Sequence, residues 1–503
     1  MAEKHIKKLA KDTAIYGVSS ILGKFLNWML MPFYTFFLKG GPTDYGVVTN
    51  LYAWTSLFLV ILTYGMETGF FRFANKNKEN ERNVYGNTLL SVGFTSVIFV
   101  LFCFAFENPI ANFLDYAKTP EYITMMGISV AIDAFAGIPF AYLRYTNKPI
   151  KFAVLKMLYV VFNIAFNIFF LVVCPWLMNH APETVNWFYN PQYGVGYVLV
   201  SNVLATIIQT LILLPYIFIG KFKFDFQILK PILKYSFPLL ILGIAGTMNQ
   251  NLDKILFPFL RPGELGKTEL GIYGATSKIA MVMLMFTQAF RYAYEPFIFA
   301  QQKDKNSLTT YADAMKFFIL FSLLIFLGMT LYLDVFKFII QKNFWPGLQV
   351  VPIVLMSFIF QGVFFNLSLW YKLTDKTMYG AWFSVLGTTI IVVLNILLVP
   401  VYSYMGCAWA AFICFFVIMV VSYLYGQKHM PIEYDFKTIG LYTAVTIVMY
   451  AISTVINTPN RLINIGLKSI LMISYMVLLV KRDFPLRTIP VINRFFNQSN
   501  RLK

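Results

Sequence analysis

Apolar residues in this chain form long stretches separated by short polar and basic segments. A helix crosses a hydrocarbon layer of about 30 Å with roughly 20 apolar residues, at 1.5 Å per residue. Fourteen stretches of this kind follow one another, and they predict an all-α integral membrane protein with about 14 transmembrane helices. They lie near residues 13–38, 45–68, 85–106, 121–142, 153–174, 194–219, 231–258, 270–298, 311–334, 347–371, 377–398, 404–425, 437–456 and 462–480.

The charges of the loops predict the orientation of these spans. Lys and Arg concentrate in the cytoplasmic loops of membrane proteins. If the N-terminus is cytoplasmic, 28 Lys and Arg residues fall on the inner side and 7 fall in the outer loops. An even number of spans returns the chain to the side on which it began, so both termini are predicted to be cytoplasmic. The longest outer loop, near 175–193, leaves little room for a soluble catalytic domain. The sequence therefore predicts a transporter and not an enzyme.

Composition narrows the class further. The chain is 58% hydrophobic and 13% charged, with a formal net charge of +18. A nucleic-acid-binding protein would gather its basic residues on one soluble face or arm, whereas these are scattered between apolar runs. Their spacing favours contact with anionic lipid headgroups instead. The sequence also lacks the phosphate-binding GxxxxGK[ST] loop, HExxH and any Cys/His cluster, so no cofactor and no metal are expected.

The first span resembles the seventh, at an offset of about 226–228 residues. The matching positions are Pro32 and Pro258, Tyr45-Gly46 and Tyr273-Gly274, and Glu67 and Glu295. A displacement of six spans preserves orientation, which predicts two pseudo-symmetric six-helix lobes that rock about a central site. The predicted units are 1–220 with spans 1–6, 221–428 with spans 7–12, and 429–503 with spans 13–14 and a basic cytoplasmic tail.

Charged residues inside the spans predict where the chemistry lies. A charge at mid-bilayer costs at least about 2.5–3.5 kcal/mol, so it normally faces a wet cavity or an ionic partner. Lys24, Lys254 and Lys278 lie in the first helices of the two lobes and are predicted to line one cavity that attracts pyrophosphate or acidic sugars. Asn249 and Gln250 are predicted to contact sugar hydroxyls, with polar contact between helices as the alternative. The alternative is that Lys24 pairs with Asp253, and Lys278 with another carboxylate, as structural bridges.

Other polar groups predict gating or ion coupling. Asp253 lies deep in a span, and Glu67 and Glu295 lie near basic residues at span ends, which allows a bridge between lobes or a proton-linked carboxylate. The predicted gating or ion-coupling residues are Glu67, Arg72, Asp253, Arg291 and Glu295; structural bridging is the alternative. Asp133 and Lys156 are predicted to satisfy one another. Pro238, Gly243 and Gly246 form the best hinge candidate.

Several motifs resemble those of a known family. They are Thr43-Asp44-Tyr45-Gly46-Val47, Tyr64-Gly65-Met66-Glu67-Thr68-Gly69-Phe70-Phe71-Arg72-Phe73, Gly271-Ile272-Tyr273-Gly274-Ala275-Thr276-Ser277-Lys278-Ile279-Ala280 and Arg291-Tyr292-Ala293-Tyr294-Glu295-Pro296. The chain resembles the polysaccharide flippases, which move O-antigen repeats and other lipid-linked oligosaccharides, of the multidrug/oligosaccharidyl-lipid/polysaccharide (MOP) superfamily.

This resemblance implies alternating access and translocation of an undecaprenyl-pyrophosphate-linked oligosaccharide across the bacterial inner membrane. The lysines would neutralise the pyrophosphate. Lipid II flippases use arginines in comparable early helices, and Lys24 stands here instead, which disfavours a peptidoglycan precursor. The implied partners are the lipid-linked oligosaccharide, membrane lipids, H⁺ or Na⁺, and polysaccharide-assembly proteins.

Two alternatives remain at this point. A multidrug or cation antiporter of the same fold would expose carboxylates in its cavity, and the excess of lysine argues against it. A non-transporting scaffold for envelope assembly is disfavoured by buried charges in both lobes.

Overall fold

A computed structural model describes residues 22–26, 28–76, 78–219, 223–301, 307–374, 376, 378–456 and 460–483, with the backbone alone at 293, 295–301, 307 and 461. Within these ranges the chain is helical almost throughout and contains no strand. A chain surrounded by lipid must satisfy its backbone N–H and C=O groups internally, and α-helices do so within each segment. The all-α class is confirmed.

Residues 22–26 and 28–37 are helical and precede the first labelled helix. The remaining α-helices are α2 (Pro42–Thr63), α3 (Met66–Lys76), α4 (Glu81–Ala105), α5 (Glu107–Phe113), α6 (Glu121–Tyr145), α7 (Pro149–Ile168), α8 (Cys174–His180), α9 (Val195–Ile217), α10 (Phe226–Leu260), α11 (Gly263–Ile279), α12 (Met281–Gln301), α13 (Ser307–Leu331), α14 (Leu333–Phe336), α15 (Val350–Leu367), α16 (Leu369–Leu373), α17 (Met378–Tyr402), α18 (Tyr404–His429), α19 (Phe436–Val455) and α20 (Arg461–Arg482). A π-helical turn, Phe169–Val173, joins α7 to α8.

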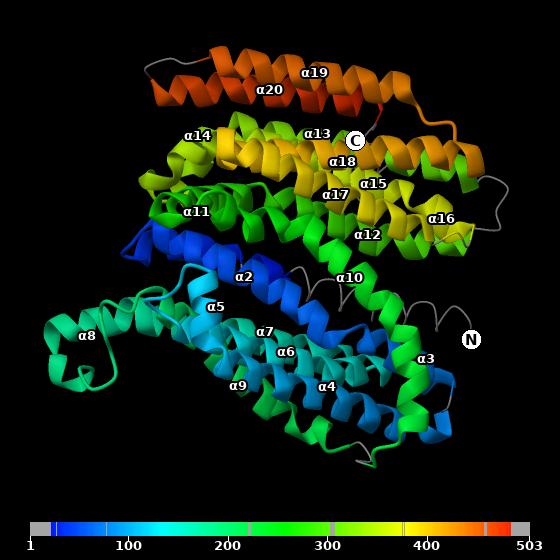
Figure 1. Cartoon of the computed structure of the whole chain (residues 1–503). Helices are drawn as coiled ribbons and strands as arrows, with labels where there is room; N and C mark the ends of the chain where they lie inside the picture. The colour runs from blue at the N-terminus through cyan, green and yellow to red at the C-terminus, as the bar shows by residue number, and fades with distance from the viewer. Residues whose placement is uncertain are drawn as a thin grey trace, which may run out of the picture.

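The long helices lie side by side in three groups (Figure 1). Helices α2–α9 form the N-bundle in the lower half of the view, and α10–α18 form the C-bundle above them. Helices α19 and α20 make an outer layer that packs on α13. The two bundles meet where α2 lies against α10 and α11, so these three helices form the centre of the molecule.

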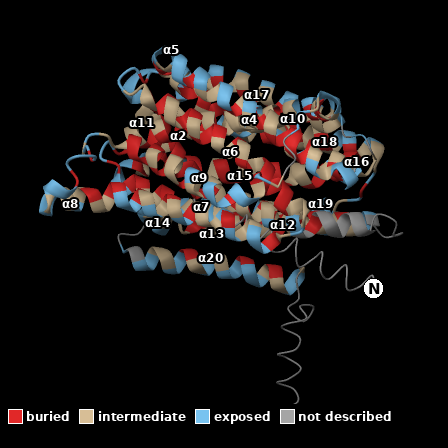
Figure 2. Ribbon diagram, turned by 90° about the horizontal axis from the view of Figure 1, so that it is seen from below, coloured by how far each residue is buried: buried red, intermediate tan, exposed pale blue. Residues whose placement is uncertain are grey.

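Burial follows from this arrangement. Residues on helix faces that point between helices are buried, and those on the outer faces are exposed, most of all along α20 (Figure 2). Large apolar side chains are among the exposed ones, including Phe94 at 67% and Leu101 at 61% on α4 and Val455 at 83% on α19. Such surface is unfavourable in water but is matched by lipid chains. The outer faces therefore fit a bilayer.

The expected number of spans holds approximately. Twelve helices of the described chain are long and apolar enough to cross a membrane, or thirteen if the bent pair α11 and α12 counts as one span. The first predicted span, 13–38, lies partly outside the described residues, and its described part is helical. Loop charge gives the orientation, so α2 and α11 begin at the outer side and α10 ends there.

The predicted hinge residues Pro238, Gly243 and Gly246 lie within the continuous helix α10, and hinge motion there stays a prediction. A bend of 43° falls between α11 and α12, at Ala280. A second break separates α2 from α3, where Tyr64 and Gly65 both have positive φ, 30° and 72°. Glycine adopts a positive φ without strain, which suits position 65. A Cβ at Gly65 would also lie 2.9 Å from Cβ of Leu239.

An ion-pair cluster ties α20 to the C-bundle. Nζ of Lys468 on α20 lies 2.8 Å from Oδ2 of Asp334, and Nζ of Lys337 lies 3.0 Å from Oδ1. The hydrogen bond from Lys468, with help from Lys337, holds the pKa of Asp334 below its ordinary value. A carboxyl whose pKa is lower in the folded protein stabilises it above the ordinary pKa, and the stabilisation disappears as pH falls through the lowered value.

Asp334→Asn is therefore expected to loosen α20 at neutral pH, as strong acid does in the unmodified protein. The partly exposed pair contributes roughly 0.5–1 kcal/mol, so amide hydrogen exchange along α20 should accelerate about two- to five-fold. Exchange measured by mass spectrometry at pH 7 tests this, with Glu183→Gln in an outer loop as the control. Unchanged exchange in the Asp334 variant would contradict this role for the cluster.

Candidate functional site

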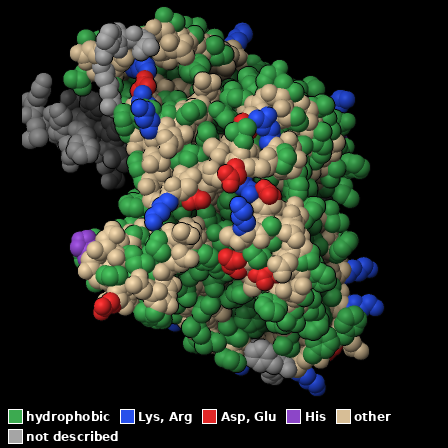
Figure 3. Space-filling view, turned by 60° about the vertical axis from the view of Figure 1, so that its left-hand side comes forward, with side chains coloured by type: hydrophobic (Ala, Val, Ile, Leu, Met, Phe, Trp, Pro, Cys, Tyr) green, Lys and Arg blue, Asp and Glu red, His purple; other side chains and the backbone are tan. Residues whose placement is uncertain are grey.

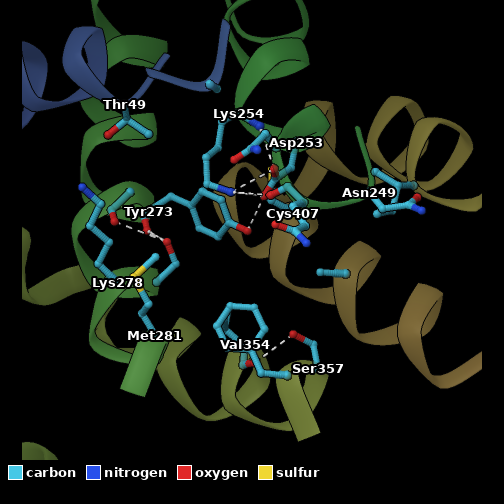
Figure 4. A pocket seen from close by; sticks show the side chains of 18 of the residues that line it. Thr49, Asn249, Asp253, Lys254, Tyr273, Lys278, Met281, Val354, Ser357 and Cys407 are labelled. Carbon is cyan, nitrogen blue, oxygen red and sulfur yellow. Dashed lines mark hydrogen bonds and ion pairs between the residues drawn. The ribbon is translucent and has the colours of Figure 1, made fainter. Parts of the chain in front are cut away.

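A cavity of about 210 Å³ lies between the two bundles (Figure 4). Helix α2 of the N-bundle supplies one wall, and α10, α11, α12, α15, α17 and α18 supply the others. Its lining includes five residues that the sequence predicted for the site: Asn249, Gln250, Asp253, Lys254 and Lys278. The grouping of Lys254 and Lys278 in one cavity is as expected, whereas their function is not decided by position.

Lys254 already has an anionic partner. Its Nζ lies 3.0 Å from Oδ1 and 3.2 Å from Oδ2 of Asp253, the preceding residue on α10. The hydroxyl of Tyr273 on α11 donates to Oδ2 of the same carboxylate at 2.6 Å. Asp253 is 8% exposed, so this carboxylate is buried beneath the two groups that bind it. The cavity therefore contains an internal ion pair supported by a tyrosine.

Lys278 differs from Lys254 because no carboxylate of the described chain binds its ammonium group. In Figure 4 its side chain lies apart from the group formed by Lys254, Asp253 and Tyr273. Within the described chain, no carboxylate comes within 4.0 Å of its ammonium group; the nearest aromatic contact is with the ring of Tyr45, whose centroid is 5.4 Å away. The indole N–H of Trp28 donates to the backbone carbonyl of Lys278 at 2.7 Å and fixes that turn of α11. Lys278 thus offers the cavity a cation without a paired anion.

Two amide residues of the lining have an oxygen without a hydrogen-bond donor. Oε1 of Gln361 on α15 and Oδ1 of Asn395 on α17 are buried and have no hydrogen-bond partner in the described structure. Buried polar atoms are nearly always satisfied, so these two amides are candidates to turn toward water or a ligand when the cavity opens. Both were missed in the sequence, although an amide within an apolar span is the signal that could have identified them.

The other predicted amides differ in availability. Asn249 is engaged within the C-bundle, since its Nδ2 donates to the carbonyl of Ser384 at 3.0 Å and its Oδ1 accepts from Thr388 at 3.1 Å. The backbone carbonyl of Gln250 accepts from Lys254 at 3.2 Å. Asn249 thus positions α10 against α17, and Gln250 helps to hold the lysine.

Lys24 does not line this cavity. Its Nζ donates to Oε1 of Gln288 on α12 at 2.6 Å, a contact between the first helix and the C-bundle. Arg291, one turn farther along α12, is close enough to repel it electrostatically. The alternative pairing of Lys24 with Asp253 is wrong, because that carboxylate is bound by Lys254 and Tyr273. Lys24 and Arg291 thus form a second basic location at the boundary between the bundles.

The remaining predicted charges are dispersed. Glu67 pairs with Arg144 of α6 inside the N-bundle and not with Arg72. The guanidinium of Arg72 lies over the ring of Tyr235 on α10, 4.2 Å from its centroid. Arg291 lies 4.7 Å from the ring centroid of Phe365. The side chain of Glu295 lies outside the described residues.

Asp133 and Lys156 lie on the adjacent helices α6 and α7 and attract one another electrostatically. The ammonium group of Lys156 also lies over the ring of Phe140, 4.1 Å from its centroid. Both residues belong to the N-bundle and are absent from the lining of the cavity. No ion pair within 4.0 Å joins the two side chains in the described structure, so direct pairing stays a prediction.

The outer end of the boundary between the bundles is closed by a close helix contact, here called the outer seal: Thr43 and Gly46 of α2 with Lys267, Thr268, Gly271 and Gly274 of α11. A Cβ on Gly46 would lie 1.8 Å from the carbonyl oxygen of Lys267, and one on Gly271 would lie 1.8 Å from that of Pro42. Only glycine allows the two backbones to approach so closely.

Polar contacts reinforce the seal. The hydroxyls of Thr43 and Thr268 are 2.7 Å apart, and Nζ of Lys267 lies 2.8 Å from Oδ2 of Asp115. In Figure 3, where the outer ends come forward, basic and acidic side chains gather in the middle of the face between apolar flanks. The N- and C-bundles are thus joined at the outer side by both packing and charge.

The helix order, the two bundles and the cavity between them define a transporter-type membrane fold. Two solved structures share it: the lipid II flippase MurJ in an inward closed conformation and a multidrug resistance MATE family transporter of the MOP superfamily in an inward-facing conformation. MurJ matches with a TM-score of 0.71 and 14% identity, over 93% of this chain and 99% of that chain. The MATE transporter matches with a TM-score of 0.65 and 13% identity, over 83% and 96%. The chain therefore shares the fold of these two proteins.

The family follows from the sequence. Residues 9–302 match the family described as polysaccharide biosynthesis protein, and the chain belongs to this family. Protein 1 of the Lsg locus of Haemophilus influenzae is 21% identical over 304 residues, which cover 59% of this chain and 68% of that protein.

Proposed function

We propose that this protein is a flippase that moves an undecaprenyl-pyrophosphate-linked oligosaccharide across the bacterial inner membrane by alternating access. The observation that carries the proposal is the cavity between the bundles, in which Lys278 is a cation without a carboxylate partner among the described residues. Phosphate oxygens are strong acceptors of charge-assisted hydrogen bonds from lysine. A pyrophosphate head group would supply the anion that this ammonium group lacks.

The uncharged groups of the cavity support a sugar next to that phosphate. Gln361 and Asn395 belong to the lining, and each has a buried amide oxygen without a donor in the described structure, which could accept once the cavity opens. Sugar hydroxyls are donors, and a site built to accept from them would discriminate against ligands without such groups. A lipid-linked sugar phosphate offers both chemistries in one head group, while its hydrocarbon tail stays in the bilayer.

The family supports this choice within the MOP fold. Its description places its members in polysaccharide biosynthesis, and one protein of the same fold is named as a lipid II flippase. A MATE-like multidrug antiporter is the rival. Cationic compounds would meet two ammonium groups and one carboxylate that is already paired, which is unfavourable. The residues of the cavity therefore favour an anionic substrate.

Alternating access would use the boundary between the bundles. We propose that residues 1–220 and 221–428 rock as two lobes, that the outer seal opens to release the head group, and that α19 and α20 belong to the unit 429–503. Glu67, Arg72, Arg291 and Glu295 are retained as gating or ion-coupling candidates, with H⁺ or Na⁺ as the ion. Lys24 and Arg291 would meet the head group on its way from the cytoplasm.

Deletion of the gene tests the proposal. The expected result is accumulation of a lipid-linked oligosaccharide on the cytoplasmic leaflet and loss of its polymerised product from the cell surface. The measurement is mass spectrometry of extracted lipid-linked glycans, with enzymatic labelling of the exposed leaflet. A plasmid copy of the gene should restore the product. Unaltered glycans together with altered efflux of cationic dyes would favour the antiporter, and unaltered glycans with unaltered efflux would favour an envelope-assembly scaffold.

A further inference from the structure

Lys254 and Lys278 face the same cavity but differ in their partners. The first is neutralised by Asp253, and the second is not paired with a carboxylate within the described chain. An anionic substrate that used both lysines would therefore have to compete with Asp253 for one of them. The contacts of Lys254 and Asp253 indicate that such an exchange of partners is feasible.

The contact between Asp253 and Lys254 is one that a helix does not favour. Adjacent residues point about 100° apart around a helix, so they do not face each other as residues three or four apart do. Lys254 makes the contact because its long side chain folds back across α10, which restricts its rotamers. A ligand phosphate in the cavity could take over the ammonium group without moving the helix backbone.

Asp253 would not be left without a partner after such an exchange. The Tyr273 hydroxyl donates to Oδ2 at 2.6 Å, and the backbone N–H of Lys254 donates to Oδ1 at 2.9 Å. Neither bond depends on the lysine side chain. These two donors reduce the cost of leaving a buried carboxylate without its cation.

We infer that Asp253 is an internal stand-in for the substrate anion: it occupies Lys254 in the empty cavity, is displaced by the head-group phosphate, and returns to Lys254 as the phosphate leaves. Tyr273 is the positioning residue that holds Asp253 during the exchange. Lys278 makes the first contact, because no carboxylate competes for it. This inference rests on the proposed function and deepens it. A transport site must release its substrate, and the return of Asp253 to Lys254 would help the phosphate to leave.

The exchange can be measured with inorganic pyrophosphate as the probe, by calorimetry on the full-length protein in lipid nanodiscs. Asp253→Asn is expected to bind pyrophosphate about tenfold more tightly. In the unmodified protein Asp253 occupies Lys254 for most of the time, and this competition lowers the apparent affinity for pyrophosphate. In cells the same variant should transport more slowly, since nothing displaces the phosphate. Tighter binding with slower transport is a combination that a merely structural role would not give.

Tyr273→Phe is expected to change the pyrophosphate affinity in the opposite direction. Without the tyrosine hydroxyl, Asp253 depends more on Lys254, and pyrophosphate affinity is expected to fall about two- to five-fold. Asp313→Asn is the matched control: it removes one carboxylate from a lysine on α13, 3.3 Å away and outside the cavity, and should leave the affinity unchanged. If the Asp253→Asn variant does not fold, the Tyr273→Phe variant is the test: a lower pyrophosphate affinity supports the proposal, and an unchanged affinity overturns it.

The possible failures are distinguishable. If the unmodified protein binds pyrophosphate and Lys278→Gln weakens binding, while the Asp253 and Tyr273 variants bind like the unmodified protein, the stand-in is overturned and phosphate recognition stands. If the unmodified protein does not bind pyrophosphate at all, both the stand-in and the proposed recognition of phosphate are overturned.

Discussion

Replacement of both Lys254 and Lys278 by glutamine is expected to slow translocation by at least about a hundred-fold while the protein remains folded in the membrane. A hydrogen bond to a charged group contributes about 1.5–3 kcal/mol, so two of them account for at least two orders of magnitude in rate. Glutamine keeps most of the side-chain length and a donor, and removes only the charge. The measurement is the rate at which lipid-linked oligosaccharide becomes accessible on the outer leaflet of proteoliposomes.

Two other lysines provide the control. Lys118 and Lys342 are exposed in outer segments, and their joint replacement by glutamine removes the same amount of charge away from the cavity. This variant should transport at the normal rate. Single replacements should separate the two cavity lysines, with Lys278→Gln causing the larger loss of binding because that lysine is unpaired. Normal transport by the Lys254 and Lys278 double variant would refute the cavity as the substrate site.

The double substitution Gly46→Ala and Gly271→Ala is expected to hold the outer seal open and reduce transport by about tenfold or more. Each new methyl group would lie 1.8 Å from a backbone carbonyl oxygen of the opposing helix, and real contacts below 3.0 Å essentially do not occur. The backbones of α2 and α11 must therefore separate. The flippase would then favour its outward-open state and return slowly to the state that accepts substrate.

Labelling from outside measures that state directly. A cysteine at Ser56, which lines the cavity, should react with a membrane-impermeant maleimide much faster in the alanine variant than in the parent. Cys407 lines the same cavity and is replaced by serine in both proteins, whereas Cys103, Cys174 and Cys414 are buried outside its lining and give little background. Gly440→Ala on α19 is the control, because nothing lies within 4 Å of its Cβ position. Equal labelling with and without the two alanines would contradict the seal.

The sequence predicted the class of fold because lipid imposes a simple rule on it. A span must be long and apolar, and loop charge then fixes its direction. The bends could not be predicted in the same way. Pro238, Gly243 and Gly246 weaken a helix locally, yet α10 is continuous through all three. The bend occurs at Ala280, a residue that carries no signal of its own.

The cavity was predicted in part for a similar reason. A charge within a span must face water or a partner, and this rule led to Lys254, Lys278 and Asp253. Whether such a charge faces water or a partner depends on packing between helices that are far apart in sequence. Lys24 obeys the same rule but contacts Gln288, 264 positions away, and the unpaired oxygens of Gln361 and Asn395 become evident only once α15 and α17 are placed.

Helix α11 carries Gly271 of the outer seal near its middle and Lys278 of the cavity near its end, within a single unbroken segment before the bend, and Gly274 between them belongs both to the seal and to the cavity lining. Closure of the seal and occupancy of the cavity are therefore linked equilibria: if a bound anion shifts the balance between closed and open forms by some factor, closure changes anion affinity by that same factor. Pyrophosphate affinity then becomes a gauge of the contact that Gly46 and Gly271 make outside the lining of the cavity. Natural variation at these two glycines would tune how strongly the protein holds its cargo, without altering any residue that lines the cavity.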